Sequence, residues 1–413
     1  MGVHTALVPS SMLNIPISLS AIDKPPSAVQ EFPHNFSAFN PSLLLAPHDD
    51  SESDAEPSML VFFRVSNMHF CPDAEPPRAS WRDSVRLQSR IQSFLAFARI
   101  GLADHALRAP AAFLTAANAL FDTARCEGVI DAGGGSLGSF TGIEDPRPIW
   151  SPSRTPWLIA AAWTHDCKRL RMHLVKFEMA EATGTLTPSE ELPLVVGSDF
   201  PREVRDAKNV PHVLPHPETL PIQKNWLPFV HDGELHVEYA LLPHVVLRVN
   251  TTTGHAQPAV PKGVHMRRAS LPYFLPLSML EEQYGSRFSG GAPPIRISDL
   301  SAFGVRRHTG IYLGLAHIKM AKDRPHDIGT SSMVYHHMFY AFEDVPPFGV
   351  IARGTLFTLP EPGDRRPTVQ FASGMVLDPP HETLTVSYST LDCGLRLTTL
   401  PLREVLADMM LIW

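Results

Sequence analysis

The chain has 413 residues, of which 44% are hydrophobic and 19% charged, and its formal net charge is −7. This apolar fraction can fill a large core, which excludes a wholly disordered chain. Binding to a nucleic-acid backbone needs an excess of lysine and arginine, so the acidic balance disfavours a nucleic-acid partner.

The first 38 residues are rich in Pro and Ser and have weak periodicity, so we expect an irregular lead-in before the main domain at 39–413. Their start carries no charged region and prolines interrupt their apolar stretches, which disfavours a signal peptide. No run is long enough to span a membrane. We therefore expect a cytoplasmic protein, with a secretory lumen as the alternative because N-glycosylation sequons begin at Asn35 and Asn250.

Two apolar runs, PSLLLAP and SMLVFFRVSN, are separated by the acidic stretch HDDSESDAEP, which predicts a hairpin with a polar loop. Residues 80–125 are rich in alanine, and their apolar residues recur at three- and four-residue spacing. This pattern predicts a helical insertion of two helices, broken near 108–110.

After residue 125 the chain returns to short apolar segments bounded by Pro, Gly or Asp. The pair LPFV and HVEYALL, joined through an Asp-Gly turn, predicts a hairpin, and PLREVLADMML predicts a short closing helix. The 40 prolines also suit many short strands and turns. The fold class is therefore all-β, with a sandwich, a barrel or a propeller as the candidate architectures.

The four cysteines, Cys71, Cys126, Cys167 and Cys393, lie far apart in the sequence and form no CxxC pair. Their spacing supports no zinc site, and we expect four thiols in a reducing compartment. We predict no metal or cofactor.

The run Glu144-Asp145-Pro146-Arg147 places two acids and a guanidinium around a proline, just before an apolar segment. One interpretation is a solvated turn, and the other is part of a binding site. Lys224 is a second unusual charge, because its neighbours in IQKNWLPF are apolar and a buried ammonium needs an anionic partner. That partner is either a bound anion or Glu144 or Asp145 in a structural ion pair.

Eight motifs occur in the same order as the strand-end motifs of glycoside hydrolase family 130, which contains the β-mannoside phosphorylases, and of its relative, glycosyltransferase family 108. The motifs are FNPSLLL (39–45), FFRVSN (62–67), GIEDPRPIW (142–150), KNWLPF (224–229), SGGAPPIRI (289–297), YLGLAH (312–317), FASG (371–374) and VSYSTLDCGLRL (386–397). The chain resembles these families over about 39–410. The resemblance implies a five-bladed β-propeller with its active site in the axial funnel.

The resemblance also implies residues that bind the sugar. Carboxylates accept hydrogen bonds from sugar hydroxyls, and arginines donate from a rigid fork. The implied substrate-binding residues are Asn40, Arg64, Glu144, Asp145, Arg147, His317, Tyr388 and Asp392. Five of them have structural alternatives: loop anchoring for Asn40, Arg64 and Asp392, and a core position for His317 and Tyr388. The nearby His336 and His337 suit core positions on an apolar strand.

In the resembled phosphorylases a lysine and a histidine help to bind inorganic phosphate. Lys224 and His244 match them here, and Arg169 or Arg171 is the expected arginine of the same cluster. The expected partners are a carbohydrate together with inorganic phosphate, a sugar phosphate or a nucleotide sugar.

The proton donor departs from the family pattern, because the Ser-x-Asp-Gly turn that carries it is absent. Asp131 is the nearest candidate catalytic residue, with Asp104 behind it. The resemblance implies a glycoside phosphorylase or glycosyltransferase that acts on β-mannosides or related glycans by inverting displacement, which still needs a proton donor. A glycoside hydrolase and a non-catalytic glycan-binding propeller are the alternatives.

Overall fold

The structure is a computed structural model that describes residues 12–15, 17, 22–23, 36–46, 57–67, 90–122, 139–164, 169–180, 185–200, 203–205, 211–213, 216–220, 222–260, 287–298, 310–321, 333–361, 369–378 and 382–411. Within these residues the chain is all-β, with two short α-helices, Thr115–Asp122 (α3) and Leu402–Asp408 (α5), and one 3₁₀ turn, Pro217–Thr219 (η3). Neither described α-helix is long and apolar enough to cross a membrane.

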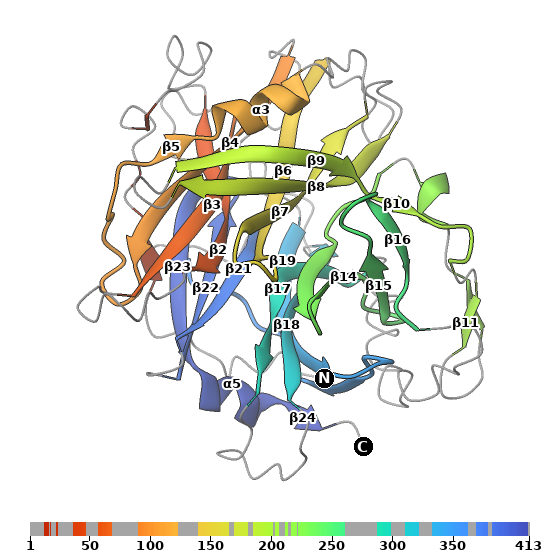
Figure 1. Ribbon diagram of the computed structural model, residues 1–413. Helices are drawn as coiled ribbons and strands as arrows, with labels where there is room; N and C mark the ends of the chain where they lie inside the picture. Colours follow the sequence, from red (N-terminus) through yellow and green to blue (C-terminus); the bar gives the residue numbers. More distant parts are fainter. Residues whose placement is uncertain are drawn as a thin grey trace.

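The described strands form four main sheets and one two-stranded ribbon (Figure 1). The largest sheet has the order Ser37–Leu45 (β2), Ser58–Ser66 (β3), Arg90–Gly101 (β4), Ser139–Trp150 (β6), Pro156–Trp163 (β7), Leu170–Ala180 (β8) and Thr185–Pro193 (β9), with Ala112–Phe113 (β5) paired to β4. The second has the order Val195–Val196 (β10), His255–Pro258 (β16), Val245–Val249 (β15), Glu234–Ala240 (β14) and Leu227–His231 (β13).

The remaining sheets come mostly from the C-terminal part of the chain. The third has the order Ser289–Ile297 (β17), Ile311–Ala321 (β18), Met333–Glu343 (β19), Val350–Arg353 (β20) and Met410–Leu411 (β24). The fourth has the order Met12–Asn14 (β1), Cys393–Pro401 (β23), Thr383–Thr390 (β22) and Gln370–Asp378 (β21). The ribbon pairs Glu203–Arg205 (β11) with Pro211–Val213 (β12).

Most strands pair antiparallel with the next strand along the chain, as the short turns between them favour. The predicted hairpin of β2 and β3 is confirmed. So is the hairpin of β13 and β14, whose turn residues Asp232 and Gly233 have φ angles of 48° and 76°. Two successive positive φ angles match the right-handed twist of the flanking strands, which is why Asp-Gly is favoured there. The predicted closing helix is α5.

Five strands, β2, β6, β13, β17 and β21, each begin a run of consecutive antiparallel strands and lie against one another. In the described chain β2 contacts β6 and β21, β13 contacts β6 and β17, and β17 contacts β21. Each of the five therefore contacts at least two of the others. Five of the eight family-like motifs lie on these strands or directly before them, and the other three lie on β3, on β18 and across β22 and β23.

Buried serines join the first and last of these strands. Ser42 in β2 donates a hydrogen bond from Oγ to the Ser373 carbonyl oxygen in β21 at 2.6 Å. Ser373 Oγ returns a hydrogen bond of 2.6 Å to the Pro41 carbonyl oxygen, which also accepts from Ser387 Oγ in β22. These serine hydroxyls donate hydrogen bonds to buried carbonyl oxygens and so join residues that are more than three hundred positions apart in the sequence.

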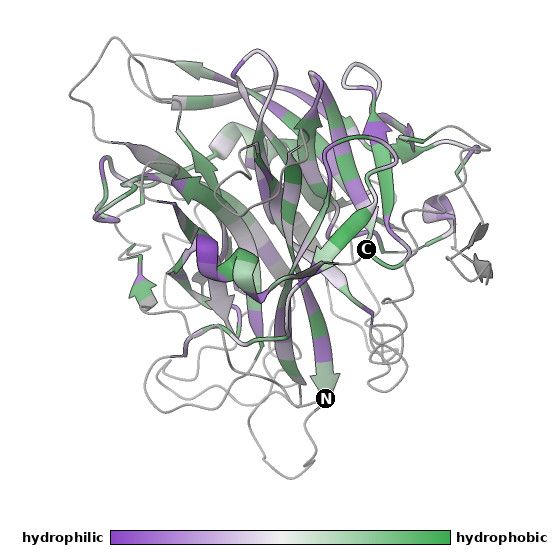
Figure 2. Ribbon diagram, turned by 90° about the horizontal axis from the view of Figure 1, so that it is seen from below, coloured by the Kyte–Doolittle hydropathy of each residue, from purple (hydrophilic) through white to green (hydrophobic). Residues whose placement is uncertain are grey.

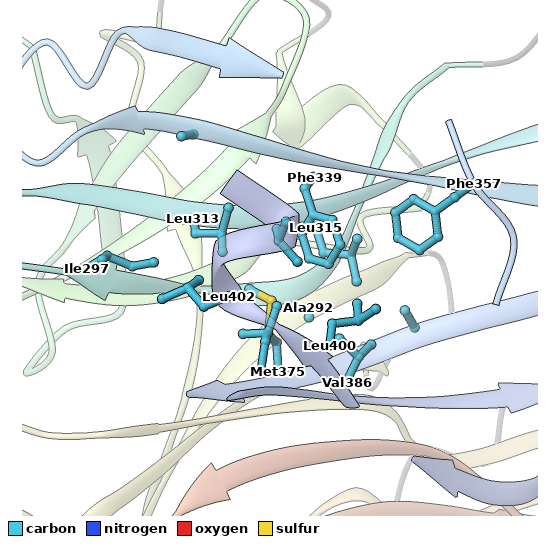
Figure 3. Packing of buried hydrophobic residues seen from close by; sticks show 14 of the residues in the cluster. Ala292, Ile297, Leu313, Leu315, Phe339, Phe357, Met375, Val386, Leu400 and Leu402 are labelled. Carbon is cyan, nitrogen blue, oxygen red and sulfur yellow. The ribbon is translucent and has the colours of Figure 1, made fainter. Parts of the chain in front are cut away.

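The hydrophobic core lies between neighbouring sheets. Figure 3 shows one cluster in which Leu313 and Phe339 of the third sheet face Met375 and Val386 of the fourth, with Leu402 of α5 at one side. Many strands carry both apolar and polar residues along their length (Figure 2), and both faces of several strands, such as β3 and β22, are buried. At the opposite end of the molecule, α3 packs against β4, β6 and β9.

The predicted helical insertion is wrong for most of its described length. Arg90–Gly101 forms β4, which pairs antiparallel with β3 from Ser93 to Gly101 and parallel with β6 at its start, and only Thr115–Asp122 is α-helical. Side chains on both faces of β4 are buried, including Leu95, Ala96 and Ile100, so apolar residues do not alternate as in a half-exposed strand. A short apolar run of this kind does not distinguish helix from strand, and pairing with β3 outweighs the helix preference of alanine.

Two smaller predictions also need correction. The lead-in is not irregular throughout, since Met12–Asn14 pairs with β23. Cys393 is not a thiol but is disulfide-bonded, and its partner lies outside the described residues. Separation along the sequence does not report separation in space, so spacing alone could not exclude this bond.

Candidate active site

Most of the predicted sugar-binding residues come together at one end of the strands. Asn40 lies in the first half of β2, Glu144 lies where β6 begins to pair with β7, and Lys224 lies three residues before β13. Because pairing is antiparallel, the carboxyl ends of the neighbouring strands reach the same edge. Arg64 of β3 thus lies opposite Phe39, and His317 of β18 lies opposite Ser289 at the start of β17.

Kinks in β2 and β6 orient the motifs FNPSLLL and GIEDPRPIW. Asn40 and Asp145 both have a φ of 50°, each is followed by proline, and each lies at a break in strand register. Asn and Asp tolerate this left-handed conformation better than other non-glycine residues. Asn40 Nδ2 donates to Asp145 Oδ1 at 2.8 Å, and Asn40 Oδ1 accepts from Ser389 Oγ at 2.7 Å. Asn40 therefore connects β2, β6 and β22.

Glu144 is held between two cations. Arg64 Nη2 lies 3.2 Å from Glu144 Oε1, and Lys224 Nζ donates to Glu144 Oε2. The side chains of Arg64 and Glu144 are each 4% exposed, whereas that of Lys224 is 34% exposed. The interpretation of Lys224 as an ion-pair partner of the acidic motif is confirmed, and its ammonium still faces solvent on one side.

Asp145 and Arg147 complete the acidic motif. Burial acts to raise the pKa of Asp145, but Lys224, Arg64 and Arg147 outweigh it and lower that pKa. Burial lowers the pKa of Arg147 to about 10, with Asp145 acting in the opposite direction. Arg147 stacks over the Phe371 ring at 5.2 Å, and its Nε and Nη2 have no hydrogen-bond partner among the described residues. These unpaired donors are available to a ligand.

Asp392 lies in the turn between β22 and β23 with a φ of 50°. No described side chain hydrogen-bonds or ion-pairs with its half-buried carboxylate. Burial raises the pKa of Asp392 to about 6, and the negative charges of Asp145 and Glu144 add to the effect while Arg64 and Lys224 oppose it. Asp392 is therefore the carboxylate of the site that can hold a proton near neutral pH.

Three residues of β18 and β19 form another wall. The rings of His317 and Tyr335 stack at 5.2 Å, and Lys319 Nζ lies 5.3 Å from the Tyr335 ring centroid. Neither ring nitrogen of His317 has a described partner, and burial holds its pKa well below the ordinary value. Desolvation and the nearby Lys224 ammonium lower the pKa of Lys319. His337, behind this wall, is fully buried in the core.

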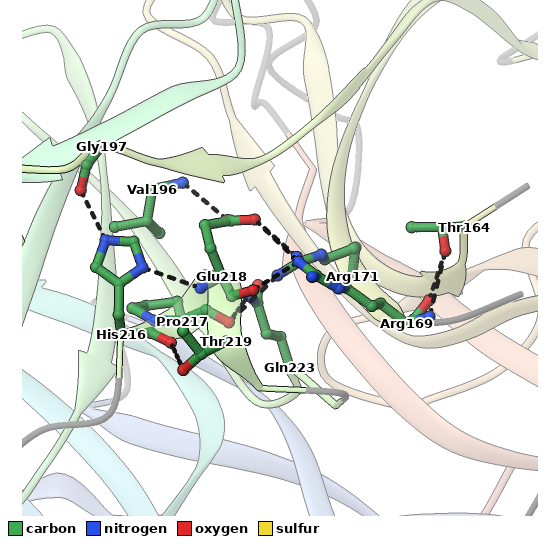
Figure 4. Close-up of polar contacts among 10 residues, drawn as sticks. All are labelled: Thr164, Arg169, Arg171, Val196, Gly197, His216, Pro217, Glu218, Thr219 and Gln223. Atoms are coloured by element: carbon green, nitrogen blue, oxygen red, sulfur yellow. Dashed lines mark hydrogen bonds and ion pairs between the residues drawn. The ribbon is translucent and has the colours of Figure 1, made fainter. Parts of the chain in front are cut away.

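Arg169 and Arg171 do not join Lys224. Both reach toward η3, where Arg171 Nη2 lies 2.7 Å from Glu218 Oε2 and Arg169 Nη1 donates to the Glu218 carbonyl oxygen at 2.5 Å (Figure 4). Arg171 also donates to the Pro217 carbonyl oxygen at 3.3 Å. These contacts hold both guanidinium groups beside the single Glu218 carboxylate.

His244 and Tyr388 are also placed elsewhere. His244 Nε2 lies 3.2 Å from Glu238 Oε2, and its Nδ1 lies 2.8 Å from the Phe348 carbonyl oxygen. Tyr388 is fully buried in the core, where its hydroxyl donates to the Pro360 carbonyl oxygen at 2.8 Å. His244 thus serves a buried network in the described structure, and Tyr388 fills the core.

The predicted proton donors are not part of the described site. Asp131 lies outside the described residues, so its role stays a prediction. Asp104 is exposed in the turn after β4, where it pairs with Arg108. Its backbone hydrogen bond with Ala106, together with Arg108, lowers its pKa, which makes it a poor proton donor.

Sequence reasoning missed Lys319, Tyr335 and Ser389. One signal was present for Lys319, because a residue two positions after His317 lies on the same face of the strand. Tyr335 lies opposite Lys319 in the β18–β19 pair, and that register is not visible in the sequence.

The side chains of the candidate site include more cations than acids. Arg64, Arg147, Lys224 and Lys319 interact with Glu144, Asp145 and Asp392, in a chain whose formal net charge is −7. Protonation of Asp392 increases the positive excess. No three His, Cys, Asp or Glu side chains gather as a metal site in the described part of the chain. The arrangement can therefore hold an anion beside hydroxyl-binding carboxylates.

No protein-family model and no curated protein matches the chain. Among solved structures it is similar to a β-1,2-mannobiose phosphorylase from Listeria innocua, with a TM-score of 0.45 and 12% identity over 91% of this chain and 93% of that one. A mannose phosphorylase from Leishmania mexicana in complex with phosphate gives 0.43 and 10% identity over 92% and 88%. A glycosyl hydrolase from Bacteroides ovatus gives 0.47 and 12% identity over 88% and 83%. Scores in this range are too low to transfer a function to this chain.

Proposed function

We propose that the chain is a carbohydrate-active enzyme whose site lies at the amino ends of β2, β6, β13, β17 and β21. The mutual contacts of these strands support a ring of five blades, a five-bladed propeller, within a single domain at 39–413, in which the largest sheet supplies two blades, β2–β4 and β6–β9. A ring explains how residues from Asn40 to Asp392 reach one site, because every blade brings the same edge of its strands to the axis.

The observation that carries the proposal is a carboxylate that can hold a proton, Asp392, beside a group with more cations than acids. Sugars are bound by carboxylates and arginines, and breaking a glycosidic bond requires a proton for the leaving oxygen. The surplus cations favour an anionic co-substrate. We assign the chain as a glycoside phosphorylase or a glycosyltransferase with a phosphorylated donor, acting on β-mannosides or related glycans as the motif series suggests.

The proposed residue roles follow the contacts. Arg64, Asp145 and Asn40 hold the sugar. Arg147 donates hydrogen bonds from its unpaired Nε and Nη2 to the ligand. Lys224 and Lys319 hold the phosphate group, in place of the predicted His244, Arg169 and Arg171. In this scheme Asp392 holds and moves the proton, and Asp131 stays the alternative donor.

Hydrolysis is the second candidate function, in which Asp145, kept ionised by its lowered pKa, is the carboxylate that accepts a proton from water. Hydrolysis needs no anion, so dependence on phosphate separates the two. A glycan-binding propeller would show neither activity.

The test uses the full chain with β-linked mannobioses plus inorganic phosphate, and with mannose 1-phosphate or a nucleotide-linked mannose plus mannose as acceptor. We expect sugar phosphate to form from the first mixture, or phosphate or nucleotide to be released from the second. Phosphate-independent release of mannose would assign a hydrolase. Binding of mannobiose without turnover under any condition would assign a binding protein.

A further inference from the structure

Two buried histidines of the third sheet have rings without hydrogen-bond partners. His317 in β18 and His337 in β19 are 1% and 0% exposed, and both ring nitrogens of each lack a partner among the described residues. Buried polar groups in proteins are nearly always hydrogen-bonded, either to the chain or to ordered water. The ring nitrogens of these neighbouring side chains therefore call for partners that the chain does not supply.

Strand pairing places the two rings side by side. His317 lies directly opposite His337 in the β18–β19 register. The backbone N–H of His337 donates to the Phe357 carbonyl oxygen at 2.7 Å, and the His337 carbonyl oxygen accepts from the Phe357 N–H at 2.9 Å. Because both backbone groups of His337 point away from β18, His317 and His337 form a non-hydrogen-bonded pair, the kind whose side chains lie closest together.

Aromatic rings enclose the pair. The Tyr335 ring stacks on His317 at 5.2 Å between centroids, the Phe371 ring meets His317 edge to face at 5.3 Å, and the Phe357 ring lies 5.9 Å from that of His337. The two imidazole centroids are 6.5 Å apart, which is too far for a direct N–H···N hydrogen bond and within reach of a bridging molecule. Because His337 is fully buried, that molecule has to be small.

Both imidazoles are neutral at neutral pH. Burial lowers the pKa of His337 to about 3 and holds the pKa of His317 well below its ordinary value. A neutral imidazole has one nitrogen that donates and one that accepts, so a water molecule can accept from one ring and donate to the other. A metal ion is disfavoured, because no third His, Cys, Asp or Glu side chain completes a metal site with them in the described part of the chain.

We propose that buried water bridges His317 and His337, and that His337 is a positioning residue that fixes the tautomer of His317. This rests on the proposed function, because His317 belongs to the wall of the site that binds the sugar. The N–H of His317 faces the water, and its other nitrogen accepts a hydrogen bond from a sugar hydroxyl. Beside the cations Lys319 and Arg147, a lone pair is favoured over an N–H at that nitrogen.

The test compares three variants of the full chain. His337→Phe keeps an aromatic ring in place but removes both nitrogens, and His337→Gln keeps donor and acceptor capacity. His336→Phe is the control, because the side chain of this neighbouring histidine lies on the opposite face of β19. Urea unfolding first establishes that each variant is folded. The protonated ring nitrogen of His317 is then identified by ¹⁵N NMR of histidine-labelled protein, and KM is measured for the saccharide and for phosphate.

We expect a single tautomer of His317 in the unaltered chain and in His336→Phe. His337→Phe should give a mixture of tautomers and raise KM for the saccharide by about twofold to tenfold, with KM for phosphate unchanged, and His337→Gln should restore both properties. Unchanged His317 signals and saccharide KM in His337→Phe would overturn the positioning role while leaving the proposed function intact.

The NMR measurement does not depend on turnover. A changed His317 tautomer in His337→Phe, in a chain that turns over no sugar, would support the positioning role and refute the proposed function. A high-resolution crystal structure of the unaltered chain provides a second measurement that needs no variant to fold. We expect it to show ordered water between the two rings, and rings in contact with no water between them would overturn the proposal.

Discussion

The pKa of Asp392 is raised, and no described residue forms a hydrogen bond or an ion pair with its carboxylate. Its pKa is about 6 in the folded chain against an ordinary value of 3.8. Between these two pH values the folded state binds more protons than the unfolded state, so stability falls as pH rises through this window. Above pH 6 the ionised carboxylate therefore remains a constant penalty.

Replacing Asp392 with Asn removes that penalty. We expect Asp392→Asn to stabilise the chain above pH 6 by about 1–2 kcal/mol, with no gain below pH 4, and to abolish turnover. Urea unfolding at pH 4 and pH 7.5 measures the first effect, and the activity assay measures the second. In the unaltered chain, activity that depends on the protonated acid should fall as pH rises through about 6. Loss of stability in Asp392→Asn at pH 7.5 would contradict the assignment.

Replacing Lys224 and replacing Lys319 should have different effects on stability. Lys224→Ala leaves the buried Glu144 with Arg64 as its remaining ion-pair partner, so we expect destabilisation by about 2–3 kcal/mol as well as lost activity. Lys319 is exposed and lies over the Tyr335 ring, so Lys319→Ala should leave stability nearly unchanged. It should reduce kcat/KM for the phosphate-bearing substrate by about tenfold to a hundredfold.

The control is Lys176→Ala, which breaks a partly exposed ion pair with Glu190 outside the site. Steady-state kinetics with varied phosphate and unfolding curves are needed for all three variants. A Lys319→Ala enzyme with an unaltered phosphate dependence would remove this lysine from the anion site.

At the scale of elements, the strands were more predictable than the contacts that turn them into a site. Short strands were predicted after residue 125 from apolar runs between prolines and glycines, and β7, β18, β19 and β21 lie there, because burial and turn chemistry are local properties. β4 was mistaken for helix because its identity depends on pairing with β3. The ion pair of Lys224 with Glu144 was one of two sequence-based alternatives, and only the fold selects between them. The Glu218 contacts of Arg171 had no sequence signal.

The kink at Asn40 allows a test of how backbone conformation supports the site. Asn40→Gly keeps the left-handed φ but loses the hydrogen bonds to Asp145 and Ser389, so we expect a loss of about 1–3 kcal/mol. Asn40→Ala loses the same bonds and also places a Cβ at positive φ, which should cost about 1 kcal/mol more. Urea unfolding gives both values. Equal stabilities of the two variants would mean that the backbone relaxes out of the left-handed conformation.

For the whole molecule, the contact between β2 and β21 decides whether the sheets behave as one unit. The Pro41 carbonyl oxygen accepts from Ser373 and Ser387, so either serine alone can still satisfy it. The double variant Ser373→Ala, Ser387→Ala leaves this buried carbonyl without a donor. We expect the single variants to lose about 1 kcal/mol each and the double variant more than their sum.

If the five blades close into a ring, this loss lowers the stability of the entire domain rather than of one blade. Unfolding followed by tryptophan fluorescence and by far-UV circular dichroism should therefore stay a single coincident transition, shifted to lower urea in the double variant. Ser153→Ala, in the exposed turn before β7, is the control and should stay within about 0.5 kcal/mol of the unaltered chain. Separate transitions in the double variant would show that the first and last sheets unfold independently. A closed propeller would then not explain why residues from Asn40 to Asp392 converge on one site.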